Sequence, residues 1–545
     1  MFIVLSRARA RSFEDDGTPA GDEAVHDLPA YVARRERERP RWVWNDTRRW
    51  YPGLLAAGVR VERCVDLRLS HAIIRASMAT AASRLARAEA GEWDAPPALV
   101  EERPPRQDTL FDLEASALPT EPDVVAEWLL QREAVAAAPE PARLGLLLAA
   151  ESAGALIAVE MKHGGLPFDK ALHETLLERV LGPRPRGFER PAELERLKGE
   201  LVRILGFEFN PDSAVELLKA LRKAGLRVES TSKWEIGAID HPVIVPLLQY
   251  KKLSRLLTAN GWAWADAWVD GGRFRPEYVP GGVVTGRWAA SGGGALQLPK
   301  QVRGAVVADP GWKLVVADAA QLEPRVLAAL SGDRGMVAAG SGDMYEGIVA
   351  SGAVATRDQA KVAMLGAMYG ATTGDSARLM PSLAKAFPRA IRLVEDAARA
   401  GERGEIVSTR LGRSSPAPGP EWDAVQSEAS ASAAAESRAR GRARSWGRFT
   451  RNFVVQGTAA EWALCWMAGL RGRLWNLADG DFVERPHLVF FLHDEVMVHA
   501  PAHLADAVAQ EVAAAAEDAG RLIFGALPVR FPVTTAIVDS YADAK

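Results

Sequence analysis

The sequence predicts an α+β protein built from several structural units, and three observations carry this prediction. The chain has 545 residues, of which 48% are hydrophobic, so it can form roughly two to four separate cores. Helical periodicity dominates from Asp123 to about Lys223. Short apolar runs typical of strands lie near the N-terminus and again after residue 280, where glycine-rich loops separate them.

Local signals place several elements along the chain. The candidate strands of the N-terminal region are Phe2–Leu5, Trp42–Trp44 and Val59–Leu69, and a charged helix end at Tyr31–Arg41 stops at Pro40. Residues 91–122 are proline-rich and aperiodic, which is typical of a loop or linker. Gly-Gly-Leu-Pro at 164–167 breaks the helical region. Within that region one helix has Asp212 or Ser213 as its cap and Gly225 as its stop. Residues 414–436 are low in complexity, and we expect them to be exposed.

Composition excludes some classes of protein. The two cysteines, Cys64 and Cys465, make no disulfide framework and no cysteine-based metal site, which suits a reducing cytosol. The N-terminus has no signal-peptide pattern, and Glu151 interrupts the longest apolar run, so we expect no membrane segment. The net charge of -3 neither supports nor excludes a nucleic-acid partner.

Three polar residues, His493-Asp494-Glu495, interrupt an otherwise apolar stretch at 488–501. The arms at 488–492 and 496–500 are strand-like, so the polar residues suit the tight connection of a hairpin. Taken alone, they are most simply turn residues. A carboxylate at such a tip would nevertheless be exposed and rigidly held.

A second stretch, GWKLVVADAAQLEPRVLAAL, brings an acid to the end of another strand at Asp318. A helix starts near Gln321, with Pro324 in its first turn, where proline costs little. Asp318 alone could be a helix cap. Together, Asp318 and Asp494 offer one carboxylate from each of two strands, which is the arrangement that holds two divalent cations for in-line phosphoryl transfer.

A third stretch, ATRDQAKVAMLGAMYG, predicts a helix with Thr356 as N-cap, Gln359 completing a capping box and Gly370 as its end. Four residues recur along one side of this helix: Arg357, Lys361, Leu365 and Tyr369. Two cations one turn apart near a helix N-terminus suit a triphosphate. The alternative is an ordinary solvated charged face.

In their order, these pieces resemble the family A DNA polymerases, the bacterial DNA polymerase I type, over residues 150–545. The motifs that carry the resemblance are YKKLSRLL, TGRW, LQLP, DAAQLEPR, RDQAKVAMLGAMYG, GEIVSTRLGR, RNFVVQGTAAE and LHDE. The resemblance implies a right-hand polymerase fold preceded by a small α/β exonuclease-like domain of the RNase H type. The implied domains are 1–145 exonuclease-like, 146–275 thumb, 276–345 first part of the palm, 346–450 fingers and 451–545 second part of the palm.

The resemblance also implies roles for individual residues. Asp318 and Asp494 would bind two Mg²⁺ ions, for which Mn²⁺ could substitute, and Glu495 would be a supporting acid. Arg357 and Lys361 would bind the triphosphate, and Lys361 would donate a proton to pyrophosphate. The other positions implied at the nucleotide are Gln321, Glu323 as the barrier to a ribose 2'-hydroxyl, Tyr345, Leu365 and Tyr369. The positions implied at primer–template DNA are Arg287, Arg448, Asn452, Gln456 and His493.

The implied activity is template-directed addition of dNTPs to a primer 3' end, in repair or gap filling. The implied protein is a monomer in the bacterial cytoplasm, associated with the nucleoid. The stretch at 437–451, rich in arginine and containing Trp446 and Phe449, could line a template backbone or be a solvated helix face.

The sequence also departs from the family pattern. Leu365 stands where a Phe or Tyr is usual, Met364 replaces an Asn and Tyr345 replaces a His. We expect weaker nucleotide binding or altered sugar discrimination from these changes. The first strand is followed by arginines, Arg7, Arg9 and Arg11, where a proofreading exonuclease needs acids.

Three further acids of the N-terminal region, Asp46, Glu62 and Asp66, are interpreted as surface charges. We therefore expect a degenerate domain without proofreading, and no 5' nuclease domain. Three alternatives stay open: a metal-dependent phosphohydrolase of the HD type built on His493-Asp494, a catalytically weakened DNA-binding homologue, and a single-subunit RNA polymerase.

Overall fold

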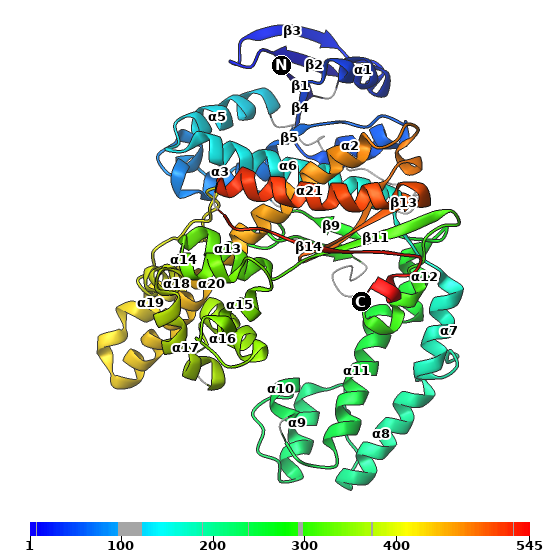
Figure 1. Ribbon diagram of the computed structural model, residues 1–545, viewed down its shortest axis with the longest axis vertical. Coiled ribbons are helices and arrows are strands. Elements are labelled where there is room, and N and C mark those ends of the chain that lie inside the picture. Colours follow the sequence, from blue (N-terminus) through cyan, green and yellow to red (C-terminus); the bar gives the residue numbers. More distant parts are fainter. Residues whose placement is uncertain are drawn as a thin grey trace, which may run out of the picture.

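The computed structural model describes residues 1–544 apart from 7, 96–122, 188, 238, 293–297, 372–373 and 527. Most of the expected linker at 91–122 and half of the LQLP motif therefore lie outside the described residues. Helices and sheets are both abundant, so the predicted α+β class is confirmed (Figure 1). From top to bottom in Figure 1, the chain forms an N-terminal unit, a central sheet, and two groups of helices below it.

The N-terminal unit is a five-stranded sheet in the order β3-β2-β1-β4-β5 with helices around it. Its strands are β1 Phe2–Ser6, β2 Arg9–Phe13, β3 Pro19–Ala24, β4 Arg41–Trp44 and β5 Cys64–Asp66. Its helices are α1 Leu28–Arg35, α2 Thr47–Ala56, α3 Leu67–Ala76, α4 Arg84–Arg87 and α5 Val124–Ala136. β4 and β5 run parallel to β1, whereas β2 and β3 are antiparallel neighbours. The strand expected at 59–69 is shorter than predicted, because the carboxylate of Asp66 caps α3 and starts a helix at Leu67.

Helix α6 (Pro141–Gly164) passes through the middle of the molecule. It is long and apolar enough to cross a membrane by length and composition, contrary to the expectation from the sequence. However, 72% of its most apolar window is buried inside the protein, as in the core helix of a soluble protein. Glu151, which interrupts the apolar run, forms a buried ion pair with Arg413 at 2.7 Å.

The central sheet has four strands in the order β12-β13-β11-β14. Its strands are β11 Trp312–Ala319, β12 His487–Leu492, β13 Glu495–Pro501 and β14 Val533–Val538. Helices α6, α20 (Ala433–Trp475) and α21 (Ala505–Phe524) pack against it. In Figure 1 these helices separate the central sheet from the N-terminal sheet. The short strands β9 Glu277–Val279 and β10 Ala289–Gly292 pair beside it, and α13 Leu322–Ser331 follows β11 directly.

Two groups of helices project below the central sheet. We call the first the arm; it comprises α7 Lys170–Leu181, α8 Ala192–Leu205, α9 Ala214–Lys223, α10 Lys233–Ile236, α11 Ile244–Asn260 and α12 Trp262–Trp268. A small sheet of β6 Leu166–Pro167, β8 Arg273–Phe274 and β7 Val269–Asp270 joins its base. Ser213 caps α9 and Gly225 follows its end with φ +84°, as predicted.

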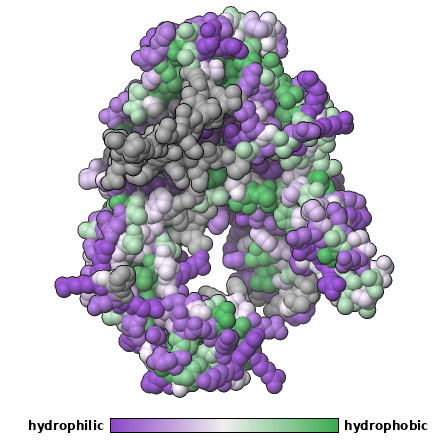
Figure 2. Space-filling model, turned by 180° about the vertical axis from the view of Figure 1, so that it is seen from behind, coloured by the Kyte–Doolittle hydropathy of each residue, from purple (hydrophilic) through white to green (hydrophobic). Residues whose placement is uncertain are grey.

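We call the second group the lobe. It comprises α14 Arg334–Ala339, α15 Met344–Ala350, α16 Arg357–Tyr369, α17 Gly374–Ala386, α18 Pro388–Glu402, α19 Pro420–Ser427 and the first half of α20. The region 414–436 is not uniformly exposed, because Ser414 and Ser415 are buried, and the amide of Met78 in the N-terminal unit donates to the hydroxyl of Ser414. Seen from behind in Figure 2, the surface is hollowed between the arm and the lobe.

Three of the four predicted domain boundaries run through continuous helices. The boundary at 145/146 falls inside α6, that at 345/346 inside α15, and that at 450/451 inside α20. One buried core extends from α6 through the arm, the central sheet and the lobe to Tyr541. Leu156 and Val159 of α6 instead pack into the core of the N-terminal unit, so α6 is shared by two cores.

Candidate functional site

The hairpin β12–β13 places Asp494 at its tip. Only His493 and Asp494 form the turn, and His493 has a left-handed φ of 58°. Glu495 is already the first residue of β13 and is buried, so its predicted place in the turn is wrong. Glu495 is not needed in the turn, because two residues, one of them left-handed, are enough to close a tight hairpin.

Asp318 lies on β11 next to this hairpin. Asp318 and Glu495 are directly opposite in the antiparallel register, and the amide of Ala319 donates a hydrogen bond of 2.9 Å to the carbonyl of Asp494. The structure therefore brings Asp318 and the tip of the hairpin together. The helix α13 starts at Leu322 with Gln321 in the N-cap position, so Asp318 is not a helix cap.

These acids fit hard divalent cations. Magnesium is commonly bound by one or two carboxylates, with waters and substrate phosphates completing its shell. Asp318 and Asp494 are both half-buried and supply such oxygens. Within the described ranges, no group of three or more His, Cys, Asp or Glu side chains is arranged to hold a metal ion.

Glu495 has a different surrounding from the two aspartates. Its carboxylate is buried and accepts a hydrogen bond from the hydroxyl of Tyr541, in the short helix at Tyr541–Ala544 near the C-terminus. Burial raises the pKa of Tyr541, and the bond to Glu495 adds to that rise. Arg303 lies over the Tyr541 ring, 4.4 Å from its centroid. Sequence reasoning missed Tyr541 and Arg303, because neither belongs to a recognisable motif.

Helix α16 presents its cations to solvent beside this site. Thr356 caps the helix through a 3.2 Å bond from the amide of Gln359, and Gly370 ends it with φ +73°. Gln359 does not complete a capping box on Thr356; its side chain instead accepts from the amide of Ala355. The predicted face is confirmed, since Arg357, Lys361, Leu365 and Tyr369 are all exposed.

A carboxylate that the sequence did not single out binds Arg357. Asp343, the N-cap of α15, accepts a 2.9 Å hydrogen bond from Nη2 of Arg357 and a 2.7 Å bond from Nε2 of Gln321. The guanidinium of Arg357 lies 5.4 Å from the ring centroid of Tyr345, which is buried. The signal available in the sequence was Asp343 two residues before Tyr345, in GDMYEGIVA.

Glu323 is held by two partners across the site. Arg287 donates to its Oε1 at 2.5 Å, and the hydroxyl of Tyr369 donates to its Oε2 at 3.1 Å. Arg287, Glu323, His493 and Asp494 line one small cavity of about 80 Å³. Burial lowers the pKa of His493, and the nearby charge of Arg287 lowers it further. Four of the predicted residues thus share one cavity although they come from separate segments.

The remaining predicted positions lie along α20. The basic stretch at 437–451 is helical, as one of its two interpretations required, and Arg448 is exposed. Trp446 and Phe449 contact each other, with ring centroids 5.0 Å apart. Asn452 lies about one helical turn and Gln456 about two turns after Arg448 on α20. Gln456 accepts a 3.0 Å bond from the hydroxyl of Thr285. Thr285 precedes Arg287 by two residues, so this bond ties the loop that carries Arg287 to α20.

A second cavity, of about 370 Å³, lies elsewhere, at the ends of β4 and β5 in the N-terminal unit. Asp46 and Asp66 line it and are buried, so their interpretation as surface charges is wrong. Both are used to cap helices, Asp46 for α2 and Asp66 for α3. Burial and the nearby Asp46 raise the pKa of Asp66 to about 6. Glu62 is more exposed and pairs with Arg39 at 2.7 Å.

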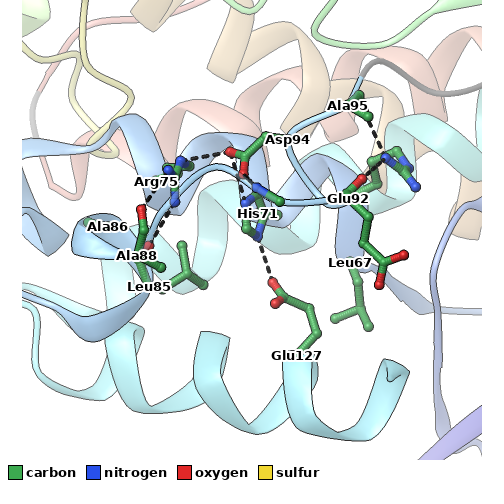
Figure 3. Close-up of polar contacts among 12 residues, drawn as sticks. Leu67, His71, Arg75, Leu85, Ala86, Ala88, Glu92, Asp94, Ala95 and Glu127 are labelled. Carbon is green, nitrogen blue, oxygen red and sulfur yellow. Dashed lines mark hydrogen bonds and ion pairs between the residues drawn. The ribbon is translucent and has the colours of Figure 1, made fainter. Parts of the chain in front are cut away.

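Figure 3 shows the polar network at the edge of the same cavity. His71 of α3 contacts Glu127 through Nδ1 at 2.7 Å and Asp94 through Nε2 at 3.3 Å. Arg75 pairs with Asp94 at 2.7 Å. These contacts join α3, which carries His71 and Arg75, to α5 through Glu127 and to the loop after α4 through Asp94. The smaller cavity is lined by Asp494 and Glu323, and Glu323 is bonded to Tyr369 on the exposed face of α16.

Comparisons with known proteins identify the family of the chain. A family model described as DNA polymerase family A matches residues 188–543. The thermostable DNA polymerase I of Thermus aquaticus is 26% identical over 380 residues, covering 60% of this chain and 42% of the relative. That of Thermus filiformis is 27% identical over 407 residues, with 65% and 44% covered. DNA polymerase I of Chloroflexus aurantiacus is 26% identical over 325 residues, with 52% and 31% covered.

The chain thus spans less than half the length of these curated relatives. A solved structure is also similar: the POL domain of Pol1 from M. smegmatis, in complex with DNA primer-template and dNTP. The match has a TM-score of 0.68 at 17% identity and covers 98% of this chain and 93% of that chain. At this identity the likeness shows a shared fold.

Proposed function

Because the chain belongs to DNA polymerase family A, we propose that it is a DNA-directed DNA polymerase that adds dNTPs to the 3' end of a primer. The observation that carries this proposal is the juxtaposition of Asp318 on β11 with Asp494 at the tip of the neighbouring hairpin. The exposed Arg357 and Lys361 of α16 supply the cationic partner that a triphosphate needs.

The proposed reaction follows from the charges at the site. Two Mg²⁺ ions, or Mn²⁺ in their place, would align the 3'-hydroxyl and stabilise the charge that develops on pyrophosphate. Asp318 and Asp494 would hold these ions, and Glu495 would support them from its buried position. Arg357 would bind the phosphates, while Lys361, one turn along the same face, would bind them and donate a proton to pyrophosphate.

Selection of the sugar is proposed for Glu323. Its carboxylate is fixed by Arg287 and Tyr369, so it cannot swing away from an incoming 2'-hydroxyl without breaking two hydrogen bonds. Gln321, Tyr345, Leu365 and Tyr369 would surround the nucleotide. Exclusion of the 2'-hydroxyl favours deoxynucleotides and argues against the alternative of an RNA polymerase.

Primer–template DNA is the proposed macromolecular partner. Arg287, Arg448, Asn452, Gln456 and His493 would contact it, and the arginine-rich first half of α20 would follow the template backbone. The arm would be the thumb, the lobe the fingers and the central sheet the palm. The DNA would then pass through the hollow between arm and lobe.

The N-terminal unit is proposed to be a degenerate 3'-5' exonuclease-like domain of the RNase H type, without proofreading. Its mixed sheet order β3-β2-β1-β4-β5 supports this assignment. The loss of activity is supported by Arg9 and Arg11 on β2 and by the use of Asp46 and Asp66 as helix caps. Arg7 lies outside the described residues. The proposed role is repair or gap filling in the bacterial cytoplasm, at the nucleoid, by a monomer.

Primer extension tests the proposal. The purified chain, a primed template and dNTPs with Mg²⁺ should give extended primer, and rNTPs should give far less. The variants Asp318→Asn and Asp494→Asn should each lose at least about 10³-fold in rate, because each removes a charged ligand worth several kcal/mol. Without dNTPs the primer should keep its 3' end, since no proofreading is expected.

The control is Asp539→Asn, at an acid beside the same sheet whose side chain is 70% exposed and pairs with Lys313. This variant should extend primers as the wild type does. A wild-type chain that binds DNA but adds no nucleotide would identify the catalytically weakened homologue instead. Normal extension by the double Asn variant would refute the metal assignment, and metal-dependent shortening of the primer would refute the loss of proofreading.

A further inference from the structure

Asp343 makes four hydrogen bonds at the junction of the lobe and the central sheet. Its Oδ1 accepts from the amides of Tyr345 and Glu346, both at 3.0 Å, and thereby caps α15. Its Oδ2 accepts from Gln321 at 2.7 Å and from Arg357 at 2.9 Å. Burial raises the pKa of Asp343, but the bonds from Arg357, the Glu346 amide and Gln321 outweigh it and lower that pKa to about 2. The carboxylate is therefore charged at every working pH.

The bond to Asp343 leaves Arg357 open to a phosphate. Only Nη2 of the guanidinium is bound to Asp343, and a guanidinium carries five N–H donors. The next acid, Glu346, is 3.9 Å from Nε. The side chain of Arg357 is still 46% exposed, while its guanidinium rests over the buried ring of Tyr345. Asp343 and Tyr345 thus fix the position of Arg357 without using up its donors.

Asp343 is itself held by a rigid chain of contacts. Oε1 of Gln321 accepts from the amide of Met344 at 3.1 Å and from Arg325 at 3.2 Å. Arg325 is 1% exposed and donates to the carbonyls of Gly340 at 2.7 Å and Gly342 at 2.6 Å. The path from the buried Arg325 through Gln321 and Asp343 to Arg357 therefore connects α13, which follows Asp318, to the first residue of α16.

We propose that Asp343 is a positioning residue for nucleotide binding, which holds Arg357 and Gln321 in the arrangement that receives the triphosphate. This inference rests on the proposed polymerase function. Side chains that are already ordered lose less conformational entropy when the ligand binds. Asp343 acts through Arg357 and touches neither substrate nor metal, so its loss changes the affinity for dNTP rather than the chemical step.

The test is Asp343→Asn in single-nucleotide primer extension, with kcat and KM for dNTP measured separately. Asparagine caps helices as well as aspartate does, so the variant removes the charge and keeps the cap. We expect KM to rise about 3- to 10-fold, which corresponds to the ordering of one or two side chains, with kcat within about twofold. The Kd for dNTP on a dideoxy-terminated primer should rise equally.

Two comparisons make the result specific. In an Arg357→Ala background, Asp343→Asn should raise KM by no more than about twofold, because its partner is gone. Asp123→Asn is the matched control: Asp123 caps α5 by accepting from the amides of Val125 and Ala126, the same pattern as Asp343, but in the N-terminal unit. It should leave KM unchanged.

The outcomes separate the two claims. An inactive wild-type chain overturns the proposed function. An active wild type whose Asp343→Asn variant keeps a normal KM, loses kcat alone, or has an effect that adds fully to that of Arg357→Ala overturns the inference. Thermal melting of each variant excludes unfolding as the cause, since a retained cap should keep Tm close to that of the wild type.

Discussion

At the scale of single residues, two residues of the candidate site have backbone conformations that most residues avoid. Gln321 has φ 51° and His493 has φ 58°, and the only other non-glycine residue with positive φ in the described part of the chain is Arg39. Such conformations cost about 1–3 kcal/mol and persist where neighbouring structure enforces them. Here Gln321 is held by Met344, Arg325 and Asp343. The strain thus lies next to the two proposed metal-binding strands.

Leu365 is one of the positions at which the proposed nucleotide site departs from the expected family pattern. Its side chain is 40% exposed on the face of α16 that carries Lys361 and Tyr369. Leu365→Phe supplies a ring that can pack against the sugar or base, a contact worth about 0.5–1.5 kcal/mol. We expect KM for dNTP to fall about 2- to 10-fold and the ratio of dideoxynucleotide to deoxynucleotide incorporation to change. Steady-state extension assays with both nucleotides measure this.

Leu522→Phe is the control for this substitution. Leu522 is also an exposed leucine on a helix, but it lies on α21, which packs against the central sheet and is not part of the proposed nucleotide site. It should leave both parameters unchanged. Identical kinetics for wild type and Leu365→Phe would rule out the proposed role of this position.

At the scale of elements, the end of α16 is fitted to α20. Gly370 adopts φ +73°, and a Cβ there would lie 2.7 Å from Cγ of Arg448. Both the left-handed conformation and the close approach require glycine. The side chain of Arg448 thus passes over the end of α16. This arginine of the basic stretch at 437–451 therefore lies beside the helix that carries Arg357 and Lys361.

This placement predicts a salt-dependent role for Arg448. Each phosphate contact that a protein loses should reduce the slope of log K against log salt by about one. We therefore expect Arg448→Ala to weaken binding of primer–template DNA and to flatten this slope by about one unit in a titration across salt concentrations. Arg84→Ala should leave the slope unchanged, because Arg84 lies in the N-terminal unit and pairs with Glu133. An unchanged slope for Arg448→Ala would remove this residue from the DNA interface.

At the scale of the whole molecule, a buried charged cluster joins the N-terminal unit to the rest. Arg471 of α20 donates to Glu160 of α6 at 2.6 and 2.8 Å, to the hydroxyl of Tyr51 of α2, and to the carbonyls of Val61 and Glu62. Burial lowers the pKa of Arg471, but the charge of Glu160 outweighs it and raises that pKa. The N-terminal unit is therefore fixed to the central sheet through helices α6 and α20.

Removal of Arg471 tests this connection. Breaking a buried ion pair from one side typically costs about 3–5 kcal/mol, because the partner charge stays buried. We expect Arg471→Met to lower the free energy of unfolding by about this amount in chemical denaturation. Arg473→Ala, two residues along, should cost about 1 kcal/mol or less, because its pairs with Glu511 and Asp518 are partly exposed. Equal effects of the two variants would contradict the proposed role of Arg471.

Much of the local structure follows from the sequence. The caps and stops of α9 and α16, Ser213, Gly225, Thr356 and Gly370, depend on neighbours a few residues away, and such short-range signals are visible in the chain. The exposed face of α16 follows from helical spacing in the same way. The position of Asp318 near the end of β11 and that of Asp494 at the hairpin tip follow from residue alternation and turn chemistry.

What only the tertiary structure decided are the contacts between residues far apart in the chain. The bond from Tyr541 to Glu495 and the burial of Asp46 and Asp66 have no local signal. The nearness of Asp343 to Tyr345 along the chain does not show that its carboxylate pairs with Gln321 and Arg357. Burial depends on which elements pack together, and a carboxylate looks the same in a sequence whether it is solvated or enclosed. The sequence by itself therefore determined which acids and cations are present and on which elements, whereas packing decided which of them meet.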